Sequence, residues 1–251
     1  MNHESKNISI DLYGDGIGKV QLVQSMGSDK TVVQAARVSF GKDEAGDTLN
    51  EKDIKLIDYL IRHNHTSVLE HCSVTFKLVV PLFVRSQHHR HRTWSYNEWS
   101  NRYRDLTKEE NSPRFYNPPT YRTQHKSNRQ ASNIEEQINP WIEEPDQWIA
   151  GSKVSDEVTE HFKYSIKLYD QMIALGVCRE QARIVLPQSM YTEYFATCCA
   201  SNLFKFIDLR THEGAQWEIQ KVAEAMLTIA SELWPITTKA YQKIRNEKVH
   251  P

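Results

Sequence analysis

Apolar residues follow two different spacings along this chain, and each spacing predicts one kind of element. In residues 51–63, Ile54, Ile57 and Ile61 recur at helical intervals, as on one face of a helix. Residues 215–233 show the same amphipathic spacing over a longer stretch. Further helices are predicted at 31–37 with Asp29 as the cap, after Pro81, from Ser155 or Asp156 to Leu175, at 179–186, from the Ser201 cap to Arg210, and at 236–245.

Two segments alternate between apolar and polar positions, as strands do. In residues 72–80, Val74, Phe76, Leu78 and Val80 share one face. Residues 190–198 form the second strand, and 63–71 form a polar loop before the first. These elements predict an α+β fold with long helices packed around a small antiparallel sheet.

Residues 105–155 break this pattern, because they contain five prolines and many polar side chains. We predict one domain over 1–251 with a polar insertion at 105–155. A structureless loop of this length is unusual, so a short helix is predicted near Ile134–Gln137.

Composition limits the classes of protein that the chain can represent. The 251 residues are 39% hydrophobic and 25% charged, with a formal net charge of −1. A near-neutral chain does not suit a general nucleic-acid binder. No apolar stretch is long enough for a membrane span, and the polar start lacks a signal-peptide core, so a cytoplasmic protein is expected. Its four cysteines form no Cys-x-x-Cys pair, which favours reduced thiols.

Residues 85–104 concentrate positive charge in this otherwise neutral chain. They contain five arginines, three histidines and one carboxylate, Glu98, among aromatic and short polar side chains. Arginine forks bind phosphate and aromatic rings pack against other rings. The run therefore suits an anionic, ring-containing ligand such as a nucleotide, a dinucleotide cofactor or nucleic acid.

The spacing within this run is specific. Arg90-His91-Arg92 is followed by seven residues and then Ser100, which resembles the signature of the flavin-dependent thymidylate synthases. Four more segments resemble that family in the same order, namely Ala35–Phe40, His65–His71, Ala182–Pro187, and Phe206–Arg210 with Ala215–Ile219. The resemblance implies methylation of dUMP with methylenetetrahydrofolate, FAD and NADPH, in a homotetramer whose sites are shared between subunits.

The resemblance also implies roles for individual residues. FAD is expected to contact His65, Ser67, Arg90, His91, Arg92, Glu98 and Lys205. The substrate nucleotide is expected to contact Gln87, His88, His89, Arg90, Glu98, Trp99, Ser100, Asn101, Arg102, Arg183 and Arg210. Lys205 stands where family members commonly have Asn or His, and Gly214 stands where a histidine is frequent.

Arg210 is the expected catalytic residue. A fixed cation beside the uracil ring lowers the free energy of the ring anion, so a ring carbon becomes nucleophilic without a protein nucleophile. Cysteine-dependent thymidylate synthases instead attack uracil with a thiolate, but here Cys72, Cys198 and Cys199 are interpreted as structural.

Plainer interpretations exist for the same residues. The arginine–histidine run suits a solvated helix end, residues 98–102 suit a turn, Arg183 suits a surface salt bridge, and Arg210 suits a helix C-terminus. Two other functions also stay open. Trp94, Tyr96, Trp99 and Tyr103 could stack single-stranded bases, and the many histidines could bind a hydrolytic metal, although no metal motif is defined. The insertion at 105–155 is either a substrate or folate lid or, more simply, solvated surface.

Overall fold

A five-stranded antiparallel sheet organises the fold. The computed structural model describes residues 8–41, 48–142 and 151–249. The strands are β1 (Ser9–Asp11), β2 (Lys19–Met26), β3 (Ser73–Pro81), β9 (Tyr191–Cys199) and β4 (Ser95–Glu98), in the spatial order β1-β2-β3-β9-β4. The fold is α+β, as expected from the sequence.

The central strand, β3, shows why this sequence forms a sheet. Its apolar residues Phe76 and Leu78 are fully buried, as the alternating pattern predicts. The opposite face is polar but paired with β9, since Thr75 and Thr197 share a 2.9 Å hydrogen bond and Lys77 lies 2.8 Å from a Glu193 carboxylate oxygen. Cross-strand pairs of this kind stabilise one register.

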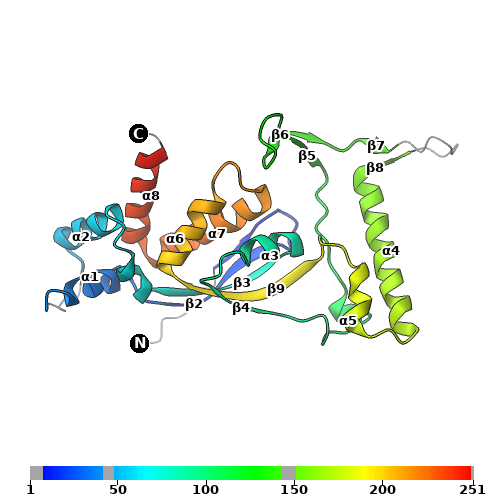
Figure 1. Ribbon diagram of the computed structural model, residues 1–251, viewed down its shortest axis with the longest axis horizontal. Helices are drawn as coiled ribbons and strands as arrows, with labels where there is room; N and C mark the ends of the chain where they lie inside the picture. Colours follow the sequence, from blue (N-terminus) through cyan, green and yellow to red (C-terminus); the bar gives the residue numbers. More distant parts are fainter. Residues whose placement is uncertain (1–7, 42–47, 143–150, 250–251) are drawn as a thin grey trace.

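Helices cover the sheet and extend its two ends. Figure 1 shows α3 (Leu82–His88), α6 (Ala200–Arg210) and α7 (Trp217–Leu233) on one side of the sheet. Helices α1 (Asp29–Val38), α2 (Glu51–Arg62) and α8 (Pro235–Val249) lie at one end, with the short 3-10 helix η1 (Thr66–His71). The main hydrophobic core lies between these helices and the sheet, and it includes Phe76, Phe206 and Trp234.

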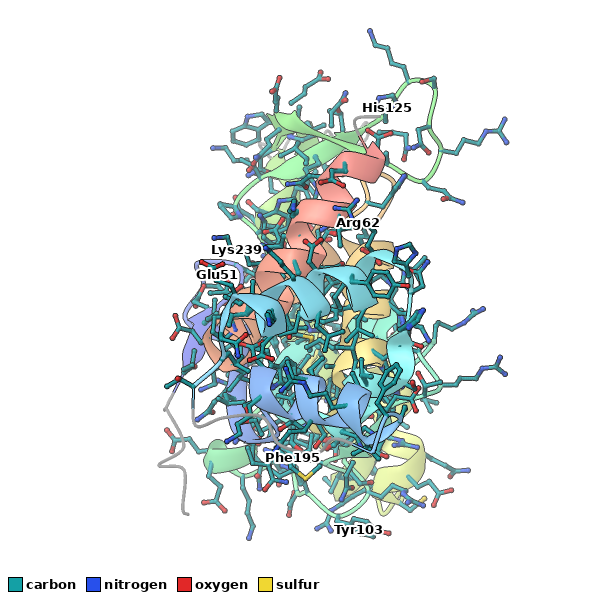
Figure 2. All side chains as sticks on the ribbon, turned by 90° about the vertical axis from the view of Figure 1, so that its left-hand side faces the viewer. Glu51, Arg62, Tyr103, His125, Phe195 and Lys239 are labelled. Atoms are coloured by element: carbon teal, nitrogen blue, oxygen red, sulfur yellow. The ribbon has the colours of Figure 1, made fainter. Side chains whose placement is uncertain are left out.

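The other end is built from the middle of the chain. Helices α4 (Val154–Ala174) and α5 (Arg179–Ala182) and the 3-10 turn η3 (Arg183–Val185) surround a second buried cluster, which includes Leu106, Tyr169 and Met190. The 3-10 turn η2 (Glu109–Asn111) precedes two small hairpins. These are β5 (Tyr121–Gln124) with β6 (Ser132–Ile138), and β7 (Trp141–Ile142) with β8 (Ser152–Lys153). Figure 2 shows His125, in the β5–β6 loop, at the top of the view and Tyr103 at the bottom.

Most of the predicted helices and both predicted strands are confirmed, with shifts of a few residues. Helix α4 ends at Ala174, two residues before the predicted stop, Gly176. Gly176 has a φ of 89° and lets the Val177 amide donate back to the Met172 carbonyl at 2.9 Å. Several predicted caps are wrong, because α4 begins at Val154 and α6 at Ala200. Asp29 begins α1 and does not precede it, and its buried carboxylate accepts the Ile236 and Thr237 amides at 3.0 and 2.8 Å.

Three other predictions are corrected by the structure. Residues 134–137 lie in β6 and are not helical. The strand pairs with β5 on both sides of them, through Asn133 with Thr123 and Gln137 with Arg122, and residues 134–136 form the irregularity between these pairs. The tertiary pairing overrides the helix preference of Glu and Gln. The polar loop at 63–71 contains η1, which buries Val68 and Leu69. Strands β1, β2 and β4 were not predicted, since they are short or only partly apolar.

Candidate active site

The arginine–histidine run is held by a histidine inside the core. Helix α3 follows Pro81, which suits a helix start, and ends at His88. The His88 ring is fully buried against Trp94 and Phe206, and its Nδ1 lies 2.8 Å from the Tyr194 hydroxyl. Burial holds the pKa of His88 well below its usual value, so the ring is neutral. His88 therefore anchors the run, and its side chain does not face an open site.

Beyond His88, the chain turns and brings His91 to Arg210 at the end of α6. Arg210 donates from Nε to His91 Nε2 at 3.1 Å and from Nη2 to the Gln87 carbonyl at 3.1 Å. Since a guanidinium only donates, this His91 nitrogen accepts and the ring is neutral. Burial and the Arg210 charge lower the pKa of His91 to about 4, in agreement with this assignment.

The arginine itself is partly buried. Burial and the nearby Arg90 lower the pKa of Arg210, although a guanidinium stays charged at any ordinary pH. Two of its nitrogens are thus engaged by fixed acceptors from the run. The plain helix-end interpretation does not describe this geometry, because the acceptors come from residues 87 and 91 and not from the carbonyls of α6.

Strand β4 returns the chain to the sheet and opens a cleft beside its end. The cleft has a volume of about 630 Å³. The sequence-predicted residues that line it are Glu98, Trp99, Ser100, Asn101, Arg102 and Arg183. We call this the Ser100 cleft. Its wall is completed by Arg85, Leu82, Ile184, Leu186, Gln188, Met190 and Thr192.

Charge in the Ser100 cleft is arranged unevenly. Glu98 is engaged, since its Oε1 accepts from the Thr192 hydroxyl at 2.5 Å and lies 3.5 Å from Arg85 Nε. Arg102 and Arg183 are exposed and form no ion pair within the described residues. Arg183 only donates to the Glu180 carbonyl at 3.2 Å. Two cations beside a hydroxyl, Ser100, suit a phosphate group.

A second group of predicted residues lies around α6 and η1. His65 and Lys205 line a smaller pocket of about 140 Å³, and Ser67 is exposed on η1. Arg90, Arg92 and Lys205 are exposed and make no ion pair in the described part of the chain. We call these three residues the cationic face. The Ser201 hydroxyl in this pocket is buried without a hydrogen-bond partner.

One chain therefore does not bring all predicted residues into one cavity. The Ser100 cleft and the His65 pocket share no lining residue. The His89 ring lies between the rings of Tyr96 and Tyr194, with centroid distances of 4.3 and 5.3 Å. Burial and the nearby Arg85 charge lower the pKa of His89.

Sequence reasoning did not assign roles to Arg85, Thr192 or Gln216. The sequence could have indicated Arg85, because it lies inside the basic run, and Gln216, because it lies inside a segment that resembles the family. The Gln87 side chain donates to the Gln216 side chain in a short hydrogen bond. Thr192 had no signal, because its position beside Glu98 depends on the pairing of β4 with β9.

The aromatic residues of the run do not form an open stacking surface. Trp94 is 6% exposed, and the Tyr96 hydroxyl donates to the His88 carbonyl at 2.8 Å. The Arg104 guanidinium covers the Trp99 ring at 3.7 Å, so only Tyr103 is largely exposed. This geometry counts against the single-stranded nucleic-acid interpretation, which needs several exposed rings.

Two of the four cysteines, Cys72 and Cys198, are buried and poorly suited to nucleophilic attack. Burial and the nearby Asp29 raise the pKa of Cys72 to about 12, and burial raises the pKa of Cys198 well above its usual value. Among the described residues, no three His, Cys, Asp or Glu side chains are grouped to hold a metal ion. Within the same residues, no helix is both long and apolar enough to span a membrane.

The fold and these two groups of unpaired cations define an α+β protein whose cleft suits a phosphorylated ligand. Comparison with known proteins narrows the class. The family described as "Thymidylate synthase complementing protein" matches residues 21–236. The chain is 40% identical to the flavin-dependent thymidylate synthase of Thermus thermophilus, over 90% of this chain and 76% of that protein. It is 39% identical to the flavin-dependent thymidylate synthase of Thermotoga neapolitana, over 90% of this chain and 91% of that protein.

Solved structures agree with the sequence comparisons. The UMP/dUMP methylase PolB from Streptomyces cacaoi, bound with 5-Br dUMP, superposes with a TM-score of 0.70 at 34% identity, covering 93% of this chain and 97% of that one. The same methylase bound with 5-Br UMP gives a TM-score of 0.68 at 32% identity. The chain belongs to the flavin-dependent thymidylate synthase family, and it is an enzyme of that family.

Proposed function

We propose that this enzyme converts dUMP to dTMP, with methylenetetrahydrofolate as the one-carbon donor and FAD, reduced by NADPH, as the hydride carrier. The observation that carries the proposal is the Arg210 guanidinium, held by His91 and the Gln87 carbonyl within the motif that resembles the family. The similar proteins of Thermus thermophilus and Thermotoga neapolitana are both named flavin-dependent thymidylate synthases.

The Ser100 cleft is the proposed binding site for the dUMP phosphate. Ser100 and the Asn101 main chain supply donors, and Arg102 and Arg183 supply the charge that phosphate requires. Glu98, fixed by Thr192 and Arg85, is placed to accept a hydrogen bond from the sugar. The remaining proposed contacts to the nucleotide come from residues 87–90 and Trp99, where His88 would act through its main chain.

The cationic face is the proposed site for FAD. A diphosphate gives a physical reason for Arg90, Arg92 and Lys205 each to be exposed without a carboxylate partner among the described residues. His65, Ser67, His91 and Glu98 complete the proposed set of contacts. When bound, FAD would supply the hydride that completes the new methyl group. The residues of this chain bind, orient and tune charge.

Arg210 is the proposed catalytic residue. Its fixed charge would stabilise the anion that remains when the uracil ring nitrogen gives its proton to solvent, and this charge would make a ring carbon nucleophilic toward the one-carbon donor. His91, as a neutral acceptor, holds the guanidinium in one orientation without competing for its charge. A preorganised cation does not have to be reoriented in the transition state, which is the main source of such stabilisation.

We further propose a homotetramer in the cytoplasm, in which one active site combines the Ser100 cleft of one subunit with the cationic face of another. The support is that the Ser100 cleft and the pocket lined by His65 and Lys205 share no lining residue within one chain. Shared sites of this kind require a symmetric assembly.

The test begins with the visible spectrum of the purified protein. Flavin absorption that bleaches with NADPH and dUMP under anaerobic conditions, followed by dTMP formation when methylenetetrahydrofolate is added, is the expected result. UMP should be assayed beside dUMP, because the similar PolB structures were solved with analogues of both nucleotides. A colourless protein that does not take up FAD would contradict the proposal.

A further inference from the structure

The polar insertion is fastened to the body of the protein by a buried carboxylate. Arg122 in β5 donates from Nη2 to Glu218 Oε1 at 2.6 Å and from Nε to the Ser132 hydroxyl of β6 at 2.9 Å. Glu218 is only 3% exposed, and it lies in the first turn of α7, where the helix dipole favours negative charge. The simplest expectation for the insertion, a solvated surface segment, does not explain this contact.

Glu218 also determines which way a neighbouring amide faces. Besides Arg122, it accepts from the Tyr116 hydroxyl at 3.2 Å and from Gln216 Nε2 at 2.8 Å. A carboxylate only accepts, so Gln216 must turn its nitrogen toward Glu218 and its oxygen away. That oxygen is the atom that accepts from the side chain of Gln87.

Gln87 connects this amide to the predicted catalytic residue. Its side chain bonds to Gln216, and its carbonyl accepts from Arg210 Nη2 at 3.1 Å. A continuous path of hydrogen bonds therefore runs through Arg122, Glu218, Gln216, Gln87 and Arg210. We call it the Glu218 network. An anchor for the insertion alone would need only the Arg122–Glu218 pair, whereas the rest of the path reaches Arg210.

We propose that Glu218 is a positioning residue for Arg210, and that Arg122 makes this positioning depend on the insertion. The proposal rests on the function proposed above, in which Arg210 favours the deprotonated uracil ring. Glu218 touches no reactant. It acts by fixing the amide direction of Gln216, and through it the position of the Gln87 main chain that holds the guanidinium.

Glu218→Gln is the direct test, because it keeps the shape and removes both the charge and the acceptor-only character. A glutamine can present either end to Gln216, so the direction of the network is lost. We expect kcat to fall on the order of tenfold or more, as small displacements of catalytic groups do. We expect a smaller change in the dissociation constant of dUMP, because the Ser100 cleft is untouched and only the Gln87 and Arg210 contacts are affected.

A second readout separates positioning from folding. The apparent pKa of the bound uracil ring can be followed by ultraviolet difference titration of the flavin-loaded protein with dUMP, in the absence of NADPH and folate. We expect this pKa to shift to higher pH in Glu218→Gln, and the pH at which kcat levels off to shift with it. Arg122→Gln should shift the uracil pKa and the pH dependence of kcat in the same direction by a smaller amount. This variant provides the test if Glu218→Gln does not fold.

Asp53→Asn is the matched control. Asp53 is another buried carboxylate in the first turn of a helix with an arginine partner, Arg37, but it lies outside the Glu218 network. It should lower the melting temperature without moving the uracil pKa. If the folded Glu218 and Arg122 variants lower only the melting temperature, the positioning role is overturned.

The two proposals fail in distinguishable ways. Wild-type protein that makes no dTMP overturns the proposed function, and the positioning role with it. If the wild-type protein is active but the Glu218 and Arg122 variants leave the uracil pKa unchanged, only the positioning role is overturned.

Discussion

At the scale of single residues, Arg210 is defined more by its acceptors than by its charge. Arg210→Lys keeps the cation but removes the paired Nε and Nη2 donors to His91 and Gln87. We expect kcat to fall on the order of 10²-fold, comparable to the loss of one preorganised donor, with a smaller change in KM for dUMP.

The measurement is steady-state dTMP formation with matched flavin content. Arg62→Lys, which alters an exposed ion pair with Glu247, is the control and should leave kcat unchanged. An Arg210→Lys enzyme with full kcat would show that charge alone suffices.

His91 gives a pH-dependent prediction for stability. Its pKa is about 4 in the folded protein and near 6.5 when unfolded, so the unfolded chain binds more protons between these values. The stabilising effect of a neutral His91 is therefore complete above about pH 6.5 and is lost as the pH falls toward 4. The lowered pKa values of His88 and His89 act in the same direction.

The check is the melting temperature at pH 7 and pH 5. Wild-type protein should melt lower at pH 5, and His91→Gln should show a smaller difference between the two pH values. His125→Asn removes a partly exposed imidazole from the β5–β6 loop, labelled in Figure 2, and the asparagine side chain can still accept from the Ser127 and Asn128 amides, so this variant should retain the wild-type difference. Equal differences in all three proteins would rule out a contribution from His91.

At the scale of elements, two glycines with positive φ should respond differently to alanine. Gly27 has a φ of 83°, and a Cβ there would lie 2.8 Å from Cys72 Sγ and 3.0 Å from the His71 carbonyl oxygen. Gly176 has a φ of 89° with nothing near its Cβ position. Gly176→Ala should destabilise by about 1–2 kcal/mol from backbone strain alone, and Gly27→Ala by more. Chemical denaturation of both variants measures the order, and the reverse order would contradict this account.

The elements also show what the sequence could predict. Strong periodicity identified β3, α2 and α7, because each buries one continuous apolar face. The pattern could not identify β4, whose four residues become a strand only through pairing with β9. The same dependence explains the site. Motif spacing indicated Ser100 and Arg102, whereas Thr192 and the Glu218 network depend on contacts between segments distant in sequence.

At the scale of the whole molecule, the separation of the two groups of predicted residues tests the proposed assembly. Arg102→Ala disables the Ser100 cleft, and Arg92→Ala disables the cationic face. If one active site combines the two from different subunits, each variant alone should be inactive. Subunits mixed at random should then recover roughly a quarter of wild-type activity, because that fraction of sites receives two intact halves.

The experiment is co-refolding or co-expression of the two variants, followed by the dTMP assay. Subunits kept separate provide the baseline. No recovery in confirmed mixed assemblies would mean that both halves belong to the same subunit.

Strand β4 makes the direction of each side chain depend on the length of the seven-residue spacer in the motif. Its side chains alternate, so Tyr96 faces the His88 carbonyl and Glu98 faces Thr192, while Ser95 and Asn97 are exposed. Inserting or deleting one residue between Arg92 and Ser100 would exchange the two faces. Glu98 would then point to solvent and Asn97 inward, although both side chains are still present. A change in the length of this spacer is therefore expected to cost activity even when Tyr96 and Glu98 are both kept.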